Sequence, residues 1–143
     1  MCNDSQLVMD NERLIVRGDP TEGALITSAK KAGLDQHEEN LRLPNLDRIP
    51  FESEHQYMVT LHRSLDTHIH VIYIKGAVEK ILERCTHELM SNNELISCNK
   101  EKILKTTEEM ASNGLRVLAF AKRILTNNQD KISHEDANGG FIF

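Results

Sequence analysis

Two basic residues have sequence neighbours that would allow their charged side chains to contact a bound anion. Lys75 follows an apolar run and precedes Gly76, and Arg116 lies in a second apolar run after Gly114. Glycine lets the backbone approach a ligand closely, and a guanidinium can make paired hydrogen bonds to a phosphate. A simpler interpretation is open at each position: a solvated lysine at a strand end, and an arginine that faces outward because an unpaired charge is costly to bury.

Phe51 and Glu22 are two further candidates that also have ordinary structural interpretations. Phe51 is one of only six aromatic residues, four Phe and two Tyr, and could simply belong to the core. Asp19 can be the N-cap of a helix, and Pro20 suits its first position. Glu22 then falls at the third position of a capping box, and that role alone could explain it.

Seven histidines raise the question of a metal site. His68 and His70 would share one face of a strand, and His55 and His62 are nearby in the sequence. Two histidines on one face do not make a tetrahedral site without further ligands, so we interpret them as solvated and predict no metal site. The spacing supports no Ser-His-Asp or Cys-His arrangement, and there is no GxxxxGKS/T loop, so no catalytic residue is predicted.

The apolar and turn-forming segments predict the elements that position these residues. Strands are predicted over residues 14–16, 46–51, 57–65, 67–75, 94–97, 115–121 and 141–143. Helices are predicted over residues 20–32, 77–85 and 100–113. The polar segments 35–45 and 126–140 are interpreted as loops. Strands outnumber helices and hairpins join several of them, so we predict an α+β fold: an antiparallel sheet of about six strands flanked by helices.

Each predicted helix has an apolar face. For the first helix these residues are Ala24, Leu25, Ala29 and Ala32, with Gly33 as a C-cap. For the second they are Val78, Ile81, Leu82 and Cys85. For the third we expect four residues to face inward, Ile103, Leu104, Thr107 and Met110.

Length and composition favour one globular domain over residues 1–143. Hydrophobic residues make up 39% and charged residues 27%, and no apolar run approaches the ~20 residues that cross a bilayer. The net charge of −5 argues against a nucleic-acid partner and means that any phosphate must be held by a local arrangement. Three cysteines without a CxxC pair favour a reducing compartment. We expect the isolated domain to be soluble and monomeric.

Four separated segments together resemble the nucleotide-binding (N) domain of P-type cation-transporting ATPases, the P2-like group in particular. They are Gly18-Asp19-Pro20-Thr21-Glu22, Pro50-Phe51-Glu52-Ser53-Glu54, Lys75-Gly76-Ala77-Val78-Glu79 and Gly114-Leu115-Arg116-Val117-Leu118-Ala119. Each match is weak alone, but their order and spacing make coincidence a poor explanation. The ends also fit, because Cys2-Asn3-Asp4 resembles the family's early helix, so the resemblance covers essentially the whole chain.

The resemblance implies a set of contacts to a bound nucleotide. Phe51 would stack on adenine, which is worth roughly 1–3 kcal/mol per base. Lys75 would lie beside the nucleotide at the base of the pocket, where Gly76 allows a close approach. Glu22 would accept a hydrogen bond from the adenine amino group, and Arg116 would reach the phosphates or the ribose. Leu118 would line the adenine pocket, and Met58 would pack against the base or in the core.

One position departs from many relatives in that family. Five residues after the stacking phenylalanine they carry a lysine or an arginine, and here the residue is Gln56. Glutamine can hydrogen-bond the nucleotide but adds no charge, so we expect a weaker attraction for phosphate. An unchanged ATP affinity of Gln56→Lys at low salt would refute this expectation.

The implied activity is ATP binding on behalf of a larger pump. The resemblance implies that Mg²⁺ is bound with ATP, mainly outside this domain, and that the γ-phosphate goes to the aspartate of a separate phosphorylation domain. The phosphorylation and actuator domains of the same pump would be its partners, and the chain would be part of the cytoplasmic head of an integral membrane protein. The DKTGT aspartate is absent from the sequence, so we do not expect this domain alone to hydrolyse ATP.

Two other classes of function compete with this interpretation. The first is a degenerate N-domain fold that acts as a regulatory or protein-interaction module without nucleotide binding. The second is a self-sufficient hydrolase, which the lack of a DxD or DKTGT nucleophile disfavours. The intact set of four segments argues against both.

Overall fold

The computed structural model describes residues 2–11, 13–67 and 69–143. Within these ranges the chain forms a two-stranded hairpin and a seven-stranded sheet of order β3-β4-β5-β8-β9-β6-β7. All neighbours in the large sheet are antiparallel except β6 and β9. The predicted α+β class with helices against an antiparallel sheet is confirmed, with seven strands in that sheet rather than about six. No helix in the described ranges combines the length and apolarity that crossing a bilayer requires.

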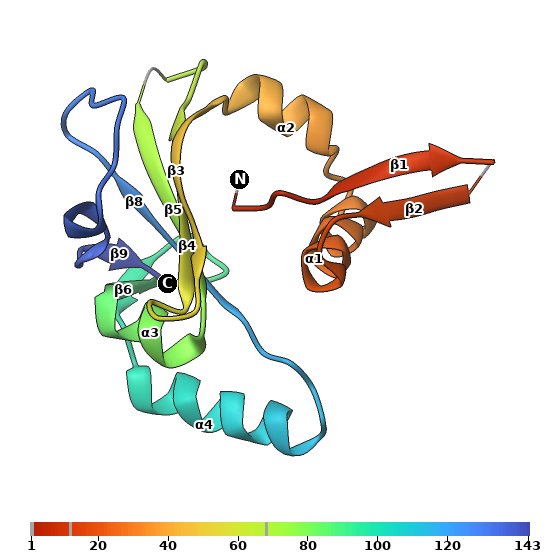
Figure 1. Cartoon of the computed structure of the whole chain (residues 1–143). Helices are drawn as coiled ribbons and strands as arrows, with labels where there is room; N and C mark the ends of the chain where they lie inside the picture. The colour runs from red at the N-terminus through yellow and green to blue at the C-terminus, as the bar shows by residue number, and fades with distance from the viewer. Residues whose placement is uncertain (1, 12, 68) are drawn as a thin grey trace.

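The elements follow one another along the chain as Figure 1 labels them. The strands are β1 Gln6–Asp10, β2 Arg13–Arg17, β3 Asn45–Glu52, β4 Tyr57–Arg63, β5 His70–Gly76, β6 Cys85–Leu89, β7 Leu95–Ser97, β8 Ala119–Ile124 and β9 Phe141–Ile142. The helices are α1 Pro20–Lys31, α2 Gln36–Arg42, α3 Val78–Arg84, α4 Lys100–Ser112 and the short 3-10 helix η1 His134–Ala137.

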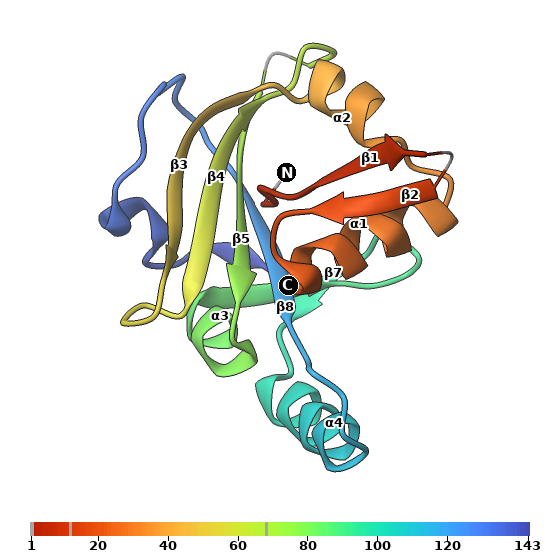
Figure 2. The same cartoon turned by 45° about the vertical axis from the view of Figure 1, so that its right-hand side comes forward.

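The main core lies on one face of the large sheet. Strands β4 and β5 present Val59, Leu61, Ile72 and Ile74 to this face, and all four are 0% exposed. Helix α3 packs over them, and its predicted apolar face is confirmed because Val78, Ile81, Leu82 and Cys85 are all buried in the core. Figures 1 and 2 show η1 on this side of the sheet and α1 with the β1–β2 hairpin on the other side.

Helix α1 begins as its sequence predicts. The Asp19 side chain accepts hydrogen bonds from the amides of Thr21 and Glu22, Pro20 is at the first helical position, and Gly33 follows the C-cap with φ +83°. The predicted apolar face is partly wrong, because the buried residues of α1 are Gly23 and Ile26. Ala24 and Ala32 are exposed, since the helix turns a different side toward the β1–β2 hairpin.

Several predicted boundaries are wrong for identifiable reasons. The segment 35–45 contains α2 rather than only a loop, because the Asp35 side chain caps it by accepting from the amides of His37 and Glu38. Residues 115–118 precede β8, which begins at Ala119 instead of Leu115. Helix α4 forms as predicted but has no buried residue, and both Leu104 and Met110 are exposed.

The N-terminal segment also differs from its prediction. Cys2-Asn3-Asp4 forms no helix; it begins against β4 and β5 on the sheet face opposite the main core and leads into β1. The Cys2 thiol lies 3.1 Å from both the Thr60 hydroxyl and the Tyr73 carbonyl oxygen. The proposed pairing of His68 with His70 lies outside the described residues, because it involves His68.

Candidate functional site

The sheet face opposite the main core holds a buried ion pair. Lys75 on β5 is only 6% exposed, and its Nζ donates to Oε1 of Glu22 at 2.6 Å. Glu22 lies in the first turn of α1, so this bond attaches the helix to the middle of the sheet. The sequence-based interpretation of Lys75 as a solvated strand-end lysine is therefore wrong.

Glu22 is held from a second direction by the N-terminal segment. Its Oε2 accepts from the amides of Asp4 and Ser5 at 2.9 and 3.1 Å and from the Ser5 hydroxyl at 3.2 Å. Burial alone would raise the pKa of Glu22, but the hydrogen bonds from Lys75, Asp4 and Ser5 outweigh it, so the pKa is lowered. The capping-box interpretation fails, because the carboxylate bonds to these groups and not to the amide of Asp19.

A cross-strand row runs over the same sheet face. Met58 pairs with Lys75, and Lys75 pairs with Phe120, so these three side chains share one face. Strand β3 is the second neighbour of β4 in the sheet. A register shift between Ile49 and Glu52 leaves two β3 residues, Pro50 and Phe51, opposite Met58 alone. This is a β-bulge, a feature that re-aims side chains near functional sites. Phe51 is 58% exposed, so it is not a core residue.

Gly76 and Gln56 meet where the β3–β4 turn returns to the sheet. A Cβ at Gly76 would lie 2.3 Å from the carbonyl oxygen of Gln56 and 2.8 Å from the Cα of Tyr57. Gln56 adopts φ +57°, and its carbonyl accepts from the amide of Ala77 at 3.0 Å. Glycine is therefore required at position 76 by the packing of its own backbone, independently of any ligand.

Arg116 lies close to the first turn of α1. Its Nη1 donates to the hydroxyl of Thr21 at 3.2 Å, and its charge helps to lower the pKa of Asp19 after the larger effect of the Glu22 amide. The guanidinium is exposed and belongs to the segment before β8, not to a strand. Leu118, two residues on, is half-buried.

Seven of the eight predicted residues, all except Leu118, therefore fall into two connected groups. Glu22, Lys75 and Arg116 converge on the first turn of α1, and Phe51, Gln56, Met58 and Gly76 surround the turn between β3 and β4. The Met58–Lys75 pairing joins them. Sequence reasoning missed Asp4, Ser5 and Thr21, which support Glu22 and Arg116. A supporting role of this kind leaves no local signal, because each partner is distant in the chain.

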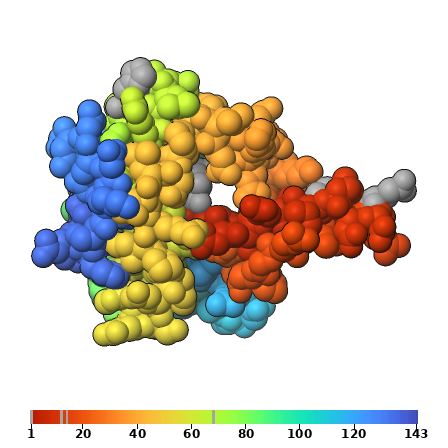
Figure 3. All heavy atoms as spheres, turned by 45° about the horizontal axis from the view of Figure 1, so that its top comes forward, coloured from red at the N-terminus to blue at the C-terminus, as the bar shows by residue number. Residues whose placement is uncertain are grey.

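A large cavity lies beside this arrangement. It has a volume of about 760 Å³ and is lined mainly by apolar residues from α1, the loop between α1 and α2, β8 and the C-terminal end, among them Leu25, Ile26, Leu34, Phe120 and Phe143. Figure 3 shows the surface hollowed between α2, in orange, and the N-terminal segment, in red. All eight predicted residues are described, and none of them lines it, although Phe120 pairs with Lys75.

Comparison with known proteins places the whole chain in one family model. Residues 1–143 match the model described as P-type ATPase, cytoplasmic domain N. The chain is 46% identical over 143 residues to a cation-transporting ATPase, pma1, of Synechocystis, covering 100% of the chain and 16% of that protein.

Two further relatives show the same relation of part to whole. A probable cation-transporting ATPase F of Mycobacterium tuberculosis is 45% identical over 117 residues, which are 82% of this chain and 13% of that protein. A calcium-transporting ATPase type 2C member 1 of Bos taurus is 35% identical over 125 residues, which are 85% of this chain and 12% of that protein. The chain thus spans less than a fifth of the length of the curated relatives it matches.

Proposed function

Because the chain belongs to the family of P-type ATPase cytoplasmic N domains, we propose that it binds the adenosine of ATP on the sheet face that carries Lys75. It would do so within a cation-transporting ATPase, whose phosphorylation domain receives the γ-phosphate on an aspartate. Residues 1–143 would form one nucleotide-binding domain of that protein. The observation that carries the proposal is the buried Lys75–Glu22 pair next to an exposed phenylalanine in a β-bulge.

Phe51 supplies the platform for the base. A largely exposed ring at a bulge gains little from the core, and covering it with adenine would remove apolar surface of both groups from water. Stacking of this kind is worth roughly 1–3 kcal/mol. Met58 and Leu118 would complete the apolar surroundings of the base.

Lys75 acts here as a hydrogen-bond donor rather than as a free charge. Its ammonium has three donors, and one of them is committed to Glu22, whose negative charge largely offsets its own. Such a neutralised donor suits the polar edge of adenosine better than a triphosphate. A hydrogen bond from the adenine amino group to Glu22 would have to share the carboxylate with Lys75, Asp4 and Ser5.

Arg116 is the better candidate for a phosphate contact. It is exposed, and the hydroxyl of Thr21 occupies only one of its five donors. Gln56, at the opposite end of the arrangement, would hydrogen-bond the nucleotide without adding charge. Mg²⁺ would enter with the phosphates and be held mainly outside this domain, because Glu22 and Asp19 already use their carboxylates within the fold.

The test is the affinity of the isolated domain for ATP, AMP and GTP, measured by calorimetry at constant ionic strength. One stacked ring and a few exposed hydrogen bonds should give about −4 kcal/mol, hence a Kd on the order of 1 mM for ATP. AMP should bind about as well as ATP, and GTP more weakly, because the base and not the phosphate chain provides most of the affinity. Equal affinities for ATP and GTP would contradict the proposed recognition of the adenine base. No saturable binding of any nucleotide at several millimolar would favour the regulatory module without nucleotide.

A further inference from the structure

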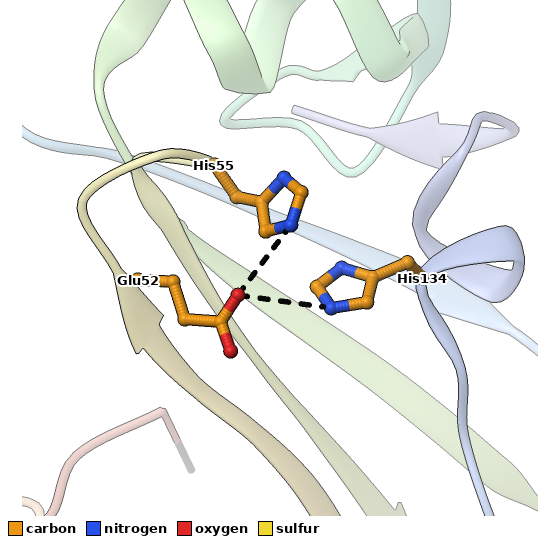
Figure 4. Close-up of side chains that lie close together, drawn as sticks. All are labelled: Glu52, His55 and His134. Carbon is orange, nitrogen blue, oxygen red and sulfur yellow. Dashed lines mark ion pairs between the residues drawn. The ribbon is translucent and has the colours of Figure 1, made fainter.

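Three side chains that sequence reasoning did not combine meet on the core side of the β3–β4 hairpin. They are Glu52 at the end of β3, His55 in the turn that follows, and His134 at the start of η1 (Figure 4). Oε2 of Glu52 lies 3.4 Å from Nε2 of His55 and 3.9 Å from Nε2 of His134. Glu52 pairs with Tyr57, so its side chain is on the opposite sheet face from Met58 and Lys75.

The shorter of these two separations equals the distance between two ligands of a tetrahedral metal ion, and the longer one exceeds it by about 0.5 Å. With metal–ligand bonds of about 2.1 Å, two ligand atoms of a tetrahedral site are about 3.4 Å apart. The potential ligand atoms of the three residues all lie within 4.8 Å of one another, so small side-chain rotations would complete the geometry. The two imidazole rings have centroids 4.3 Å apart, and Figure 4 shows both Nε2 atoms directed at the Glu52 carboxylate.

Tyr57 orients one of the proposed ligands. Its hydroxyl lies 2.9 Å from Nδ1 of His134, the ring nitrogen that does not face the cluster. If that nitrogen carries the proton, Nε2 keeps a lone pair for a metal. Ligating histidines commonly have this kind of partner on their second nitrogen, and it fixes both tautomer and ring orientation.

We propose that Glu52, His55 and His134 form a binding site for a divalent transition metal of the Zn²⁺ class. Two imidazoles with one carboxylate favour Zn²⁺ and its neighbours over Mg²⁺ or Ca²⁺, which prefer oxygen ligands alone. A water molecule would fill the remaining position, since the side chains are 36–47% exposed. The sequence-based expectation of no metal site considered His55 with His62, His68 and His70 but not His134, because His134 is far from His55 in the chain.

The metal would join two separate parts of the chain. The hairpin turn 53–56 contributes His55, and the segment between β8 and β9 contributes His134. The cluster includes none of the residues proposed to contact the nucleotide and lies on the other sheet face. The metal site can therefore be confirmed or refuted independently of ATP binding.

A titration of the nucleotide-free domain with ZnCl₂, followed by calorimetry and amide NMR at neutral pH with a non-thiol reductant, tests this proposal. We expect one saturable equivalent, with shifts at residues 52–57 and 133–136. His55→Gln and His134→Gln should each weaken binding by at least about tenfold, and Tyr57→Phe should weaken it less. The matched control is His87→Gln, since His87 is an exposed histidine on β6 and should not affect binding.

Two outcomes would overturn the proposal. No saturable uptake up to about 1 mM ZnCl₂, hence a Kd above the millimolar range, would mean that the cluster is an ordinary ion pair. Undiminished binding in both histidine variants, with loss in Cys98→Ser, would assign the metal to the cysteines. Amide spectra of the zinc-free variants that overlay on that of the parent domain would show that the fold is intact.

Discussion

At the scale of single residues, the carboxylate of Glu22 connects the fold to the proposed nucleotide site. Its sequence context offered two roles, helix capping and a contact with adenine, and the structure adds a third. Glu22 fastens α1 and the N-terminal segment to Lys75 on the sheet. No local pattern predicts this, since the Lys75 partner is 53 positions away in the chain. The burial of Lys75 could not be predicted from its local sequence either, because lysine is rarely buried without a partner.

Lys75→Met should therefore destabilise the domain even without nucleotide. Methionine keeps the length of the side chain, but Glu22 loses its cation while it remains largely buried. Removing one partner of a buried pair costs about 3 kcal/mol, which urea unfolding at neutral pH would measure. Lys105→Met on the exposed face of α4 is the matched control and should change stability by less than about 0.5 kcal/mol. Equal effects of the two variants would contradict the structural role of the pair.

At the scale of elements, sequence patterns predict best where apolar spacing and capping agree. Helix α3 was predicted with its correct buried face, and α1 with its N-cap, because these signals are local. Helix α2 was missed because it has no buried residue; the Asp35 cap and the exposed Arg42–Glu39 pair stabilise it instead. The β-bulge at Pro50 and Phe51 was also not predicted, since a bulge depends on the partner strand and not on its own residues.

Gly76→Ala should disturb the end of β5 more than its small size suggests. The added methyl group would meet the backbone at Gln56 and Tyr57, which cannot rotate away as a flexible side chain can. Overpacking of this kind costs about 2–3 kcal/mol, measurable as a lower midpoint of urea unfolding. Gly114→Ala is the comparison, because open space surrounds it and only its φ of +76° opposes a side chain, at about 1 kcal/mol. A smaller effect at position 76 than at 114 would contradict this packing argument.

At the scale of the whole molecule, segments far apart in the chain supply the residues around the Lys75–Glu22 pair. The family resemblance predicted which residues to compare, but the strand order and the parallel β6–β9 pair could not be predicted from local patterns. They depend on pairings between strands far apart in the chain. The same limit applies to the Glu52–His55–His134 cluster, whose members come from the β3–β4 hairpin and from the segment between β8 and β9.

The buried His62 makes the stability of the whole domain depend on pH. Its Nδ1 lies 2.7 Å from the carbonyl oxygen of Leu43, its Nε2 has no hydrogen-bond partner among the described residues, and burial lowers its pKa from 6.5 to about 4. Below pH 6.5 the unfolded chain binds a proton that the folded chain does not, so stability falls as the pH drops toward 4. Between pH 6.5 and 4.5 the loss should be about 2–3 kcal/mol.

His62→Asn tests this assignment. Asparagine can still donate to the carbonyl of Leu43 but does not titrate, so the unfolding free energy should change much less between pH 6.5 and 4.5. His87→Asn removes an exposed histidine and should leave the slope unchanged. An unchanged slope in His62→Asn would mean that other groups cause the pH dependence.

The most direct test of the central claim is an amide NMR titration with ATP that locates the nucleotide. We predict shifts concentrated at Phe51, Gln56, Lys75 and Gly76, and their loss in Phe51→Ala but not in Leu95→Ala, which removes an equally exposed apolar side chain on the edge strand β7. Shifts that cluster instead at Leu34 and Phe143, and persist in Phe51→Ala, would place the ligand in the apolar cavity. That result would contradict the proposed nucleotide site.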